Sequence, residues 1–149
     1  MTIVLAISSV FSVLACHWLG LLVIRPVFQA ILSRLGPHGR WGQDVSLAVA
    51  ILMLVSWLFL DVALCAALVR YHAGGGSFAQ AFLFAIASFT TVGAETSDRG
   101  GLWSLAGPLI AMCGIFIFGW TTSFLVECSH AIRDVGAANK ARDSRKANS

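Results

Sequence analysis

The chain has 149 residues, of which 58% are hydrophobic and only 11% are charged, and its formal net charge is +3. Soluble domains have about 25% charged residues, so this composition excludes a water-soluble protein, because one core could not bury so much apolar surface. We therefore expect an all-α membrane protein. No catalytic grouping, metal-ligand spacing or phosphate-binding loop indicates an enzyme, and the few basic residues do not indicate nucleic-acid binding.

Three apolar runs are long enough to cross a membrane, and they cover residues 2–24, 45–69 and 102–126. At a rise of about 1.5 Å per residue, each run spans a hydrocarbon core of about 30 Å. The first run has no basic segment before it and no obvious Ala-x-Ala site, which favours a peripheral transmembrane helix at 1–24 over a cleaved signal peptide. His17 lies in this run, and we expect it to be a hydrogen-bonded packing residue.

The fourth apolar run, residues 78–94, has only 17 residues. If it crossed the bilayer, the basic linker at 25–44 and the basic tail at 128–149 would lie on opposite sides. If it dips in and returns, the two basic segments lie on the same side of the bilayer. That side then has eight basic residues and the other side has two. The positive-inside rule prefers this second arrangement, with the N-terminus outside, the linker and tail in the cytoplasm, and the chain in the cell membrane. The eight residues are Arg25, Arg34, Arg40, Arg133, Lys140, Arg142, Arg145 and Lys146.

Residues 78–90 are predicted to form a short pore helix, with Ser77 as its N-cap. The Thr90-Thr91-Val92-Gly93 stretch that ends this region is poor helix material, because Thr and Val are β-branched and Gly ends regular structure. The C-terminal end of a helix carries a partial negative charge, which favours a cation just beyond it. We therefore expect an extended chain at 91–93 whose backbone carbonyls replace part of the hydration shell of an ion.

In this arrangement residues 45–127 resemble the pore module of the potassium-channel superfamily. The parts are an outer helix at 45–69, a pore helix at 78–90, a filter at 91–95 and an inner helix at 102–126. The resemblance implies a homotetramer around one axis in a lipid bilayer, conducting K⁺ or Na⁺ without a cofactor. It implies ion-binding positions at Thr90, Thr91, Val92, Gly93, Ala94 and Glu95.

The outer half of the filter departs from that family. Ala94-Glu95-Thr96 stands where potassium channels have Tyr-Gly-Asp, so the bracing aromatic residue and the second glycine are missing. We expect weakened discrimination of K⁺ from Na⁺. Four copies of Glu95 and Asp98 would form a ring of carboxylates that concentrates cations and binds divalent cations, which would block monovalent current. The alternative for both residues is an ordinary solvated loop.

Other residues are expected to support the pore. Asp61 is the one charge inside a span, and a hydrogen bond to Ser88, Thr90 or a backbone group behind the filter would satisfy it. In the inner helix, Gly114 and Gly119 resemble the glycines at which such helices bend to open a gate. The alternative for both glycines is close helix packing.

At the inner mouth, Glu127 either rings a vestibule that attracts cations or pairs with a nearby basic residue. Trp57 lies in the middle of a span and is expected to pack against a neighbouring helix. Residues 134–149 are polar and are predicted to form a disordered basic tail. The altered filter leaves a second hypothesis open: a non-conducting membrane subunit of the same fold, with a modulatory or structural role.

Overall fold

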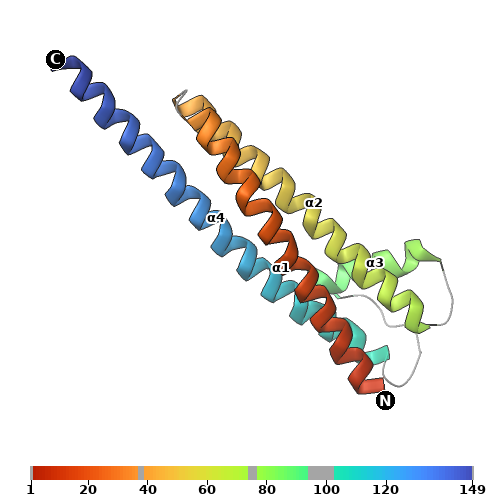
Figure 1. Ribbon diagram of the computed structural model, residues 1–149. Coiled ribbons are helices and arrows are strands. Elements are labelled where there is room, and N and C mark those ends of the chain that lie inside the picture. Colours follow the sequence, from red (N-terminus) through yellow and green to blue (C-terminus); the bar gives the residue numbers. More distant parts are fainter. Residues whose placement is uncertain (1, 37–38, 74–76, 94–102, 149) are drawn as a thin grey trace. The chain divides into compact units, whose positions relative to one another are not determined.

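The computed structural model describes residues 2–36, 39–73, 77–93 and 103–148, which form four helices (Figure 1). The helices are α1 (Thr2–Leu35), α2 (Arg40–Ala73), α3 (Phe78–Phe89) and α4 (Trp103–Ala147). No β-strand occurs in these four ranges. The all-α fold is therefore confirmed for the described part of the chain.

Three of the helices, α1, α2 and α4, are long and apolar enough to cross a membrane. Many of their large side chains are exposed in the single chain, among them Phe11, Phe59 and Phe116. Water solvates such a surface poorly, whereas lipid tails are themselves apolar. The chain is a multi-pass membrane protein, as its composition predicts.

The basic linker predicted at 25–44 is mostly helical, because α1 and α2 extend into it from both sides. Ile24, Phe28 and Leu32 explain the continuation of α1: they recur at every fourth position, and all three are buried. This spacing gives α1 one apolar face beyond the predicted end of its span.

The tail also differs from the prediction, because α4 continues as a helix through residues 134–147 instead of becoming disordered. This stretch is rich in Ala, Lys and Arg, which are strong helix formers. It also has a tertiary contact: Asn139 Nδ2 donates a hydrogen bond to the backbone carbonyl oxygen of Gly36 at 3.0 Å. Its low content of large apolar residues therefore predicted the wrong state.

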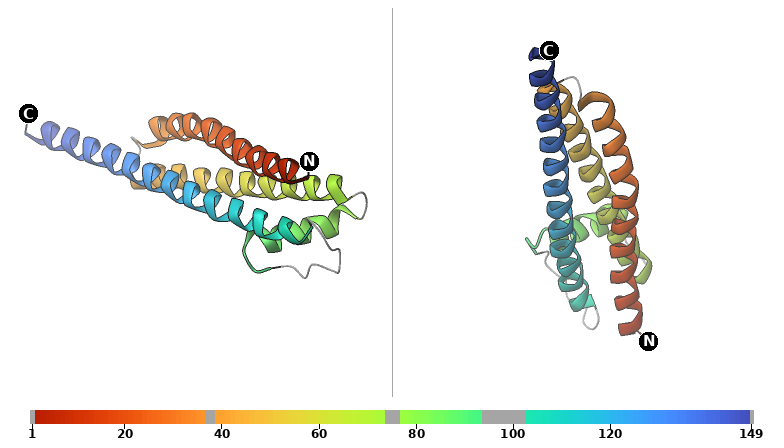
Figure 2. Two further views of the ribbon diagram at one scale, coloured as in Figure 1. Left: turned by 90° about the horizontal axis from the view of Figure 1, so that it is seen from below. Right: turned by 60° about the vertical axis from the view of Figure 1, so that its left-hand side comes forward.

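Two compact units make up the chain: Met1–Leu19 with Ser56–Trp120, and Gly20–Val55 with Thr121–Ser149. The first unit contains α3, the short helix in Figure 2. Its buried apolar core takes residues from all four helices: Val13, Val62, Cys65, Ala66, Ala85, Phe89, Ile110 and Ile117. The second unit has buried apolar residues of its own: Ile24, Phe28, Leu32, Ala50, Leu54, Phe124 and Cys128.

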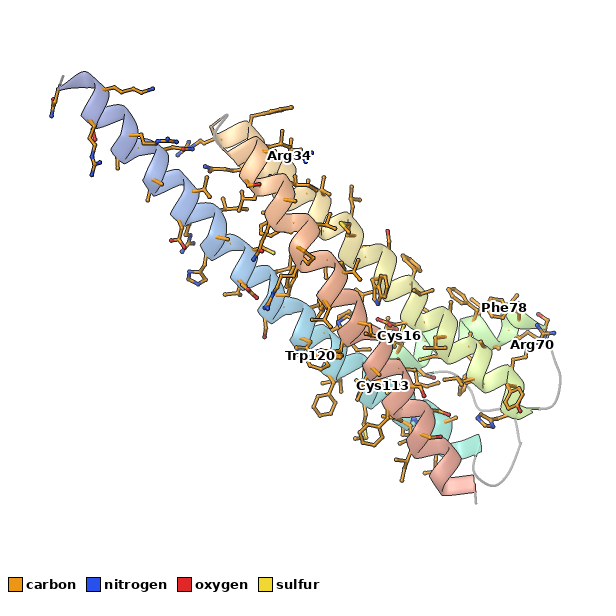
Figure 3. The ribbon with its side chains drawn as sticks, in the orientation of Figure 1. Cys16, Arg34, Arg70, Phe78, Cys113 and Trp120 are labelled. Atoms are coloured by element: carbon orange, nitrogen blue, oxygen red, sulfur yellow. The ribbon has the colours of Figure 1, made fainter. Side chains whose placement is uncertain are left out.

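Trp57 in the first unit makes the helix contact that its position predicts. Its indole Nε1 donates a hydrogen bond to the backbone carbonyl oxygen of Cys16 in α1 at 3.2 Å. Cys16 is labelled on α1 in Figure 3, together with Cys113 on α4. Among the described residues, no group of three or more His, Cys, Asp and Glu side chains could hold a metal ion.

Candidate pore segment

α3 begins with a capped N-terminus. The Ser77 hydroxyl oxygen accepts a hydrogen bond from the backbone N–H of Gln80 at 3.3 Å, which satisfies one of the free donors in the first turn. The predicted cap is therefore confirmed. The helix has 12 residues, so its length is about 18 Å, well short of a hydrocarbon core of about 30 Å.

The chain after α3 forms a left-handed turn instead of an extended segment. Thr91 has a φ of 60° and Gly93 has a φ of 85°. The Thr91 N–H donates to the Ser88 carbonyl oxygen at 3.0 Å, and the Gly93 N–H donates to the Ala87 carbonyl oxygen at 3.1 Å. The extended conformation predicted for 91–93 is therefore wrong for this structure.

The physical reason lies in the end of the helix itself. The last carbonyl groups of an α-helix have no partner inside the helix, and a left-handed turn brings the amides of the following residues to them. Gly93 adopts a positive φ easily, whereas Thr91 is β-branched and disfavours it. The backbone at Thr91 is therefore strained, and another set of hydrogen-bond partners would favour a different conformation.

The end of α3 is open to its surroundings in the single chain. The exposed residues are Thr90, Thr91, Val92 and Gly93. Val92 is an apolar residue with 81% of its surface exposed, and the partial negative charge of the helix end lies at the same place. Ala94, Glu95 and Asp98, which were also predicted to face ions, lie outside the described residues.

α4 approaches the end of α3 closely at Gly114. A Cβ atom at this position would lie 2.1 Å from the Phe89 carbonyl oxygen, so only glycine fits. Phe89 is 2% exposed, and its ring meets the Phe118 ring edge-on with 5.7 Å between centroids. The packing alternative for Gly114 therefore has direct support. A Cβ at Gly119 would meet no atom within 4 Å, and bending at either glycine stays a prediction.

Asp61 has a different partner from the ones predicted. Its Oδ2 atom lies 2.7 Å from His17 Nδ1 in α1, and both side chains are 0% exposed. Its Oδ1 atom is buried without a hydrogen-bond partner among the described residues. Ser88 is buried as well, and it contributes its backbone carbonyl to the turn. The expected bond from Asp61 to Ser88, Thr90 or the nearby backbone is therefore wrong, while His17 is confirmed as a hydrogen-bonded packing residue.

Sequence reasoning missed this pair because the two residues are 44 positions apart. Each lies in an apolar run, and the pairing exists only once α1 packs against α2. One signal was available: an ionisable side chain inside a span needs a partner of matching chemistry. His17 in the first span met that condition for Asp61 in the second.

Glu127 pairs with a basic residue, which was one of its two predicted roles. Its Oε2 atom forms a salt bridge with Arg25 Nη2, between α4 and α1 of the second unit. Both side chains are about half exposed, so solvent screens much of the attraction. The vestibule role stays a prediction.

No protein-family model, curated protein or solved structure matches this chain. The resemblance of residues 45–127 to a potassium-channel pore module therefore stays a prediction.

Proposed function

We propose that four copies of this chain assemble into a cation channel whose conducting segment is the end of α3. The observation that carries the proposal is a short apolar helix between two helices long enough to cross a membrane, ending in the exposed residues 90–93. A helix of this length cannot reach the far side of the bilayer. Irregular backbone at membrane depth is tolerated only where protein encloses it or where it lines water, and four copies around one axis would enclose it.

The basic residues support a re-entrant α3. With α3 entering and leaving on one face, the last turns of α1 and α4 both point to the opposite face. Arg34 lies in the last turn of α1 (Figure 3), and Arg145 and Lys146 lie in the last turn of α4. By the positive-inside rule this side is the cytoplasm, which puts the N-terminus outside and the chain in the cell membrane.

Oxygen atoms are the ligands that this segment offers to a cation. The Thr90 and Thr91 hydroxyls and the carbonyls of residues 91–93 are too few in one chain to replace the hydration shell of K⁺ or Na⁺, whereas four chains supply enough. Pointing those carbonyls at a common axis requires the turn to extend, which breaks the two hydrogen bonds back to α3. The strain at Thr91 lowers the free-energy cost of that change.

The sequence beyond the turn bears on selectivity. Ala94 and Glu95 replace the residues that complete a selective potassium filter, so the proposed channel passes both K⁺ and Na⁺. Four Glu95 carboxylates at the outer mouth would concentrate monovalent cations and bind divalent cations, which then block the current. No cofactor takes part.

A non-conducting membrane subunit is the second candidate function, and the turn at 91–93 favours it. Its two amides are bonded back to the carbonyls of α3, and a chain that keeps this turn offers no row of carbonyls to an ion. Such a subunit would have a modulatory or structural role.

Ion flux through the purified protein in liposomes tests the channel. We expect K⁺ and Na⁺ to enter at comparable rates, and Thr91→Ala and Glu95→Gln to change the rate or the ion ratio several-fold, because each removes an oxygen ligand or a charge from the path. Ser144→Ala and Asp44→Asn are matched controls, since they remove a hydroxyl and a carboxylate from exposed positions in the second unit. No flux of either ion after removal of divalent cations would favour the non-conducting subunit.

A further inference from the structure

The buried His17–Asp61 pair has no part in the conduction proposed above, although it lies in the same unit as α3. We propose that this pair positions the end of α3: it fixes the register of α1 against α2, and α2 in turn holds the core on which Phe89 packs. The inference rests on the proposed function where it concerns ion flow. His17 and Asp61 are positioning residues, and neither contacts the ion.

The geometry of the pair does not favour stability. Both side chains are fully buried, and moving two ionisable groups out of water is so unfavourable that well-packed apolar residues commonly give equal or greater stability. Asp61 also leaves Oδ1 without a partner among the described residues, which adds a further unfavourable contribution. A hydrogen bond forms at one register only, whereas apolar packing tolerates sliding. The geometry therefore points to a role in fixing the position of α1 against α2.

A third helix also contacts the pair. The His17 ring lies beside the Trp120 ring of α4, with 6.3 Å between centroids and 30° between planes. Trp120 and Cys16, the residue before His17, are both labelled in Figure 3. His17 therefore contacts both α2 and α4, so its ring has a defined place from which to orient Asp61.

A continuous buried core connects Asp61 with the end of α3. Ala85 and Phe89 of α3 share this core with three residues that follow Asp61 in α2. Those residues are Val62, Cys65 and Ala66. Phe89 is the last residue of α3, directly before the turn. Because protein interiors are close-packed, a small shift of α2 is transmitted to Phe89 and to the turn that follows it.

Three variants distinguish a positioning role of the pair from a stabilising role: His17→Leu, Asp61→Leu and the double variant. Each single variant is expected to lower the unfolding temperature, because it leaves one ionisable side chain buried without its partner. The double variant removes both groups and is expected to unfold at the wild-type temperature or above it. If the pair served stability alone, the double variant would have a wild-type turn, whereas a positioning role predicts an altered one.

Hydrogen exchange of the 149-residue chain measures how often the turn opens, and it does not depend on ion flow. The Thr91 and Gly93 amides are bonded to α3 carbonyls, and their exchange reports how often these bonds open. In the double variant we expect these two amides to exchange about tenfold faster than in wild type, with a changed ratio of K⁺ to Na⁺ flux in liposomes. The Gln80 amide at the other end of α3 should not change.

Arg25→Gln is the matched control, because it breaks the Arg25–Glu127 salt bridge of the second unit and should change neither the turn nor the flux ratio. Asp61→Asn keeps an oxygen to which His17 donates, so the Thr91 and Gly93 amides should exchange as in wild type. Faster exchange of these amides in Asp61→Asn overturns the proposal. A wild-type turn and flux ratio in the double variant overturn it as well. If the double variant does not fold, His17→Leu takes its place, and wild-type exchange of the Thr91 and Gly93 amides in that variant overturns the proposal. Absence of flux from wild type contradicts the channel alone, since hydrogen exchange still tests the positioning role.

Discussion

Single atoms set the packing around the end of α3. At Gly114 the missing Cβ leaves room for the Phe89 carbonyl oxygen, and at Asp61 one carboxylate oxygen has a partner while the other has none among the described residues. Both residues are buried in surroundings packed as densely as an organic crystal, so neither can change without moving its neighbours.

Gly114→Ala is expected to lower the free energy of unfolding by about 1–3 kcal/mol, because the new methyl group overpacks the contact with Phe89. Gly119→Ala is the matched control: its methyl group would meet no atom within 4 Å, and Ala is a better helix former than Gly. Thermal unfolding of both variants in detergent measures the difference. Equal effects at the two positions would contradict the close approach of α4 to α3.

The His17–Asp61 and Arg25–Glu127 pairs should respond differently when one partner is lost. Glu127→Gln breaks a half-exposed pair and is expected to cost less than about 1 kcal/mol. His17→Leu leaves Asp61 fully buried without its partner and is expected to cost about 3–5 kcal/mol. Thermal unfolding at low and high salt measures both, and only the Arg25–Glu127 contribution should weaken with salt. A small effect of His17→Leu would mean that water reaches Asp61.

At the scale of the helices, both ends of α3 have a local chemical cause. α3 starts where Ser77 supplies an acceptor to a free amide, and it ends where Thr91 and Gly93 supply donors to free carbonyls. α4 continues into its polar end because helix-forming residues meet a tertiary contact at Asn139. The ends of α3 are therefore determined within a few residues of sequence, whereas the end of α4 also depends on distant residues.

Ser77→Ala is expected to destabilise the start of α3 by about 1 kcal/mol, because the Gln80 amide loses its acceptor. Ser77→Asp keeps an oxygen acceptor at the cap and should behave like wild type. Hydrogen exchange at Gln80 measures the effect directly. Unchanged protection in Ser77→Ala would show that the cap bond contributes nothing to the helix start.

At the scale of the whole molecule, one copy of the chain cannot complete the proposed pore. Residues 90–93 are exposed in the single chain, including the apolar Val92. A membrane protein leaves such a segment uncovered only where lipid, water or another copy meets it. The proposed tetramer covers it with the same segment of neighbouring copies.

Val92→Asn tests this assembly. We expect unchanged helix content by circular dichroism and about a tenfold loss in the association constant of the proposed tetramer, measured by native mass spectrometry. The reason is that an apolar residue that the proposed tetramer would bury is replaced by a polar one. Tyr71→Asn is the matched control, since Tyr71 is also 81% exposed but lies at the end of α2. A wild-type protein that stays monomeric would contradict the tetramer itself.

The amino-acid sequence by itself determined the membrane class, the three long apolar helices and the short α3 with its Ser77 cap. These features depend on hydrophobic run length and on contacts between residues close in the chain, such as Ser77 and Gln80. The same reasoning failed for residues 134–147, because their polar composition predicts a disordered tail although the stretch is helical.

Only the tertiary structure decided which distant groups meet. Asp61 required a partner by its chemistry, but His17 became that partner through the packing of α1 against α2, 44 residues apart in sequence. The need for glycine at position 114 likewise arises only when α4 packs against Phe89, because a Cβ atom there would clash with the Phe89 carbonyl oxygen. A buried polar group needs a hydrogen-bond partner, and this need can be predicted from the sequence. Which residue provides the partner depends on how the helices pack in three dimensions.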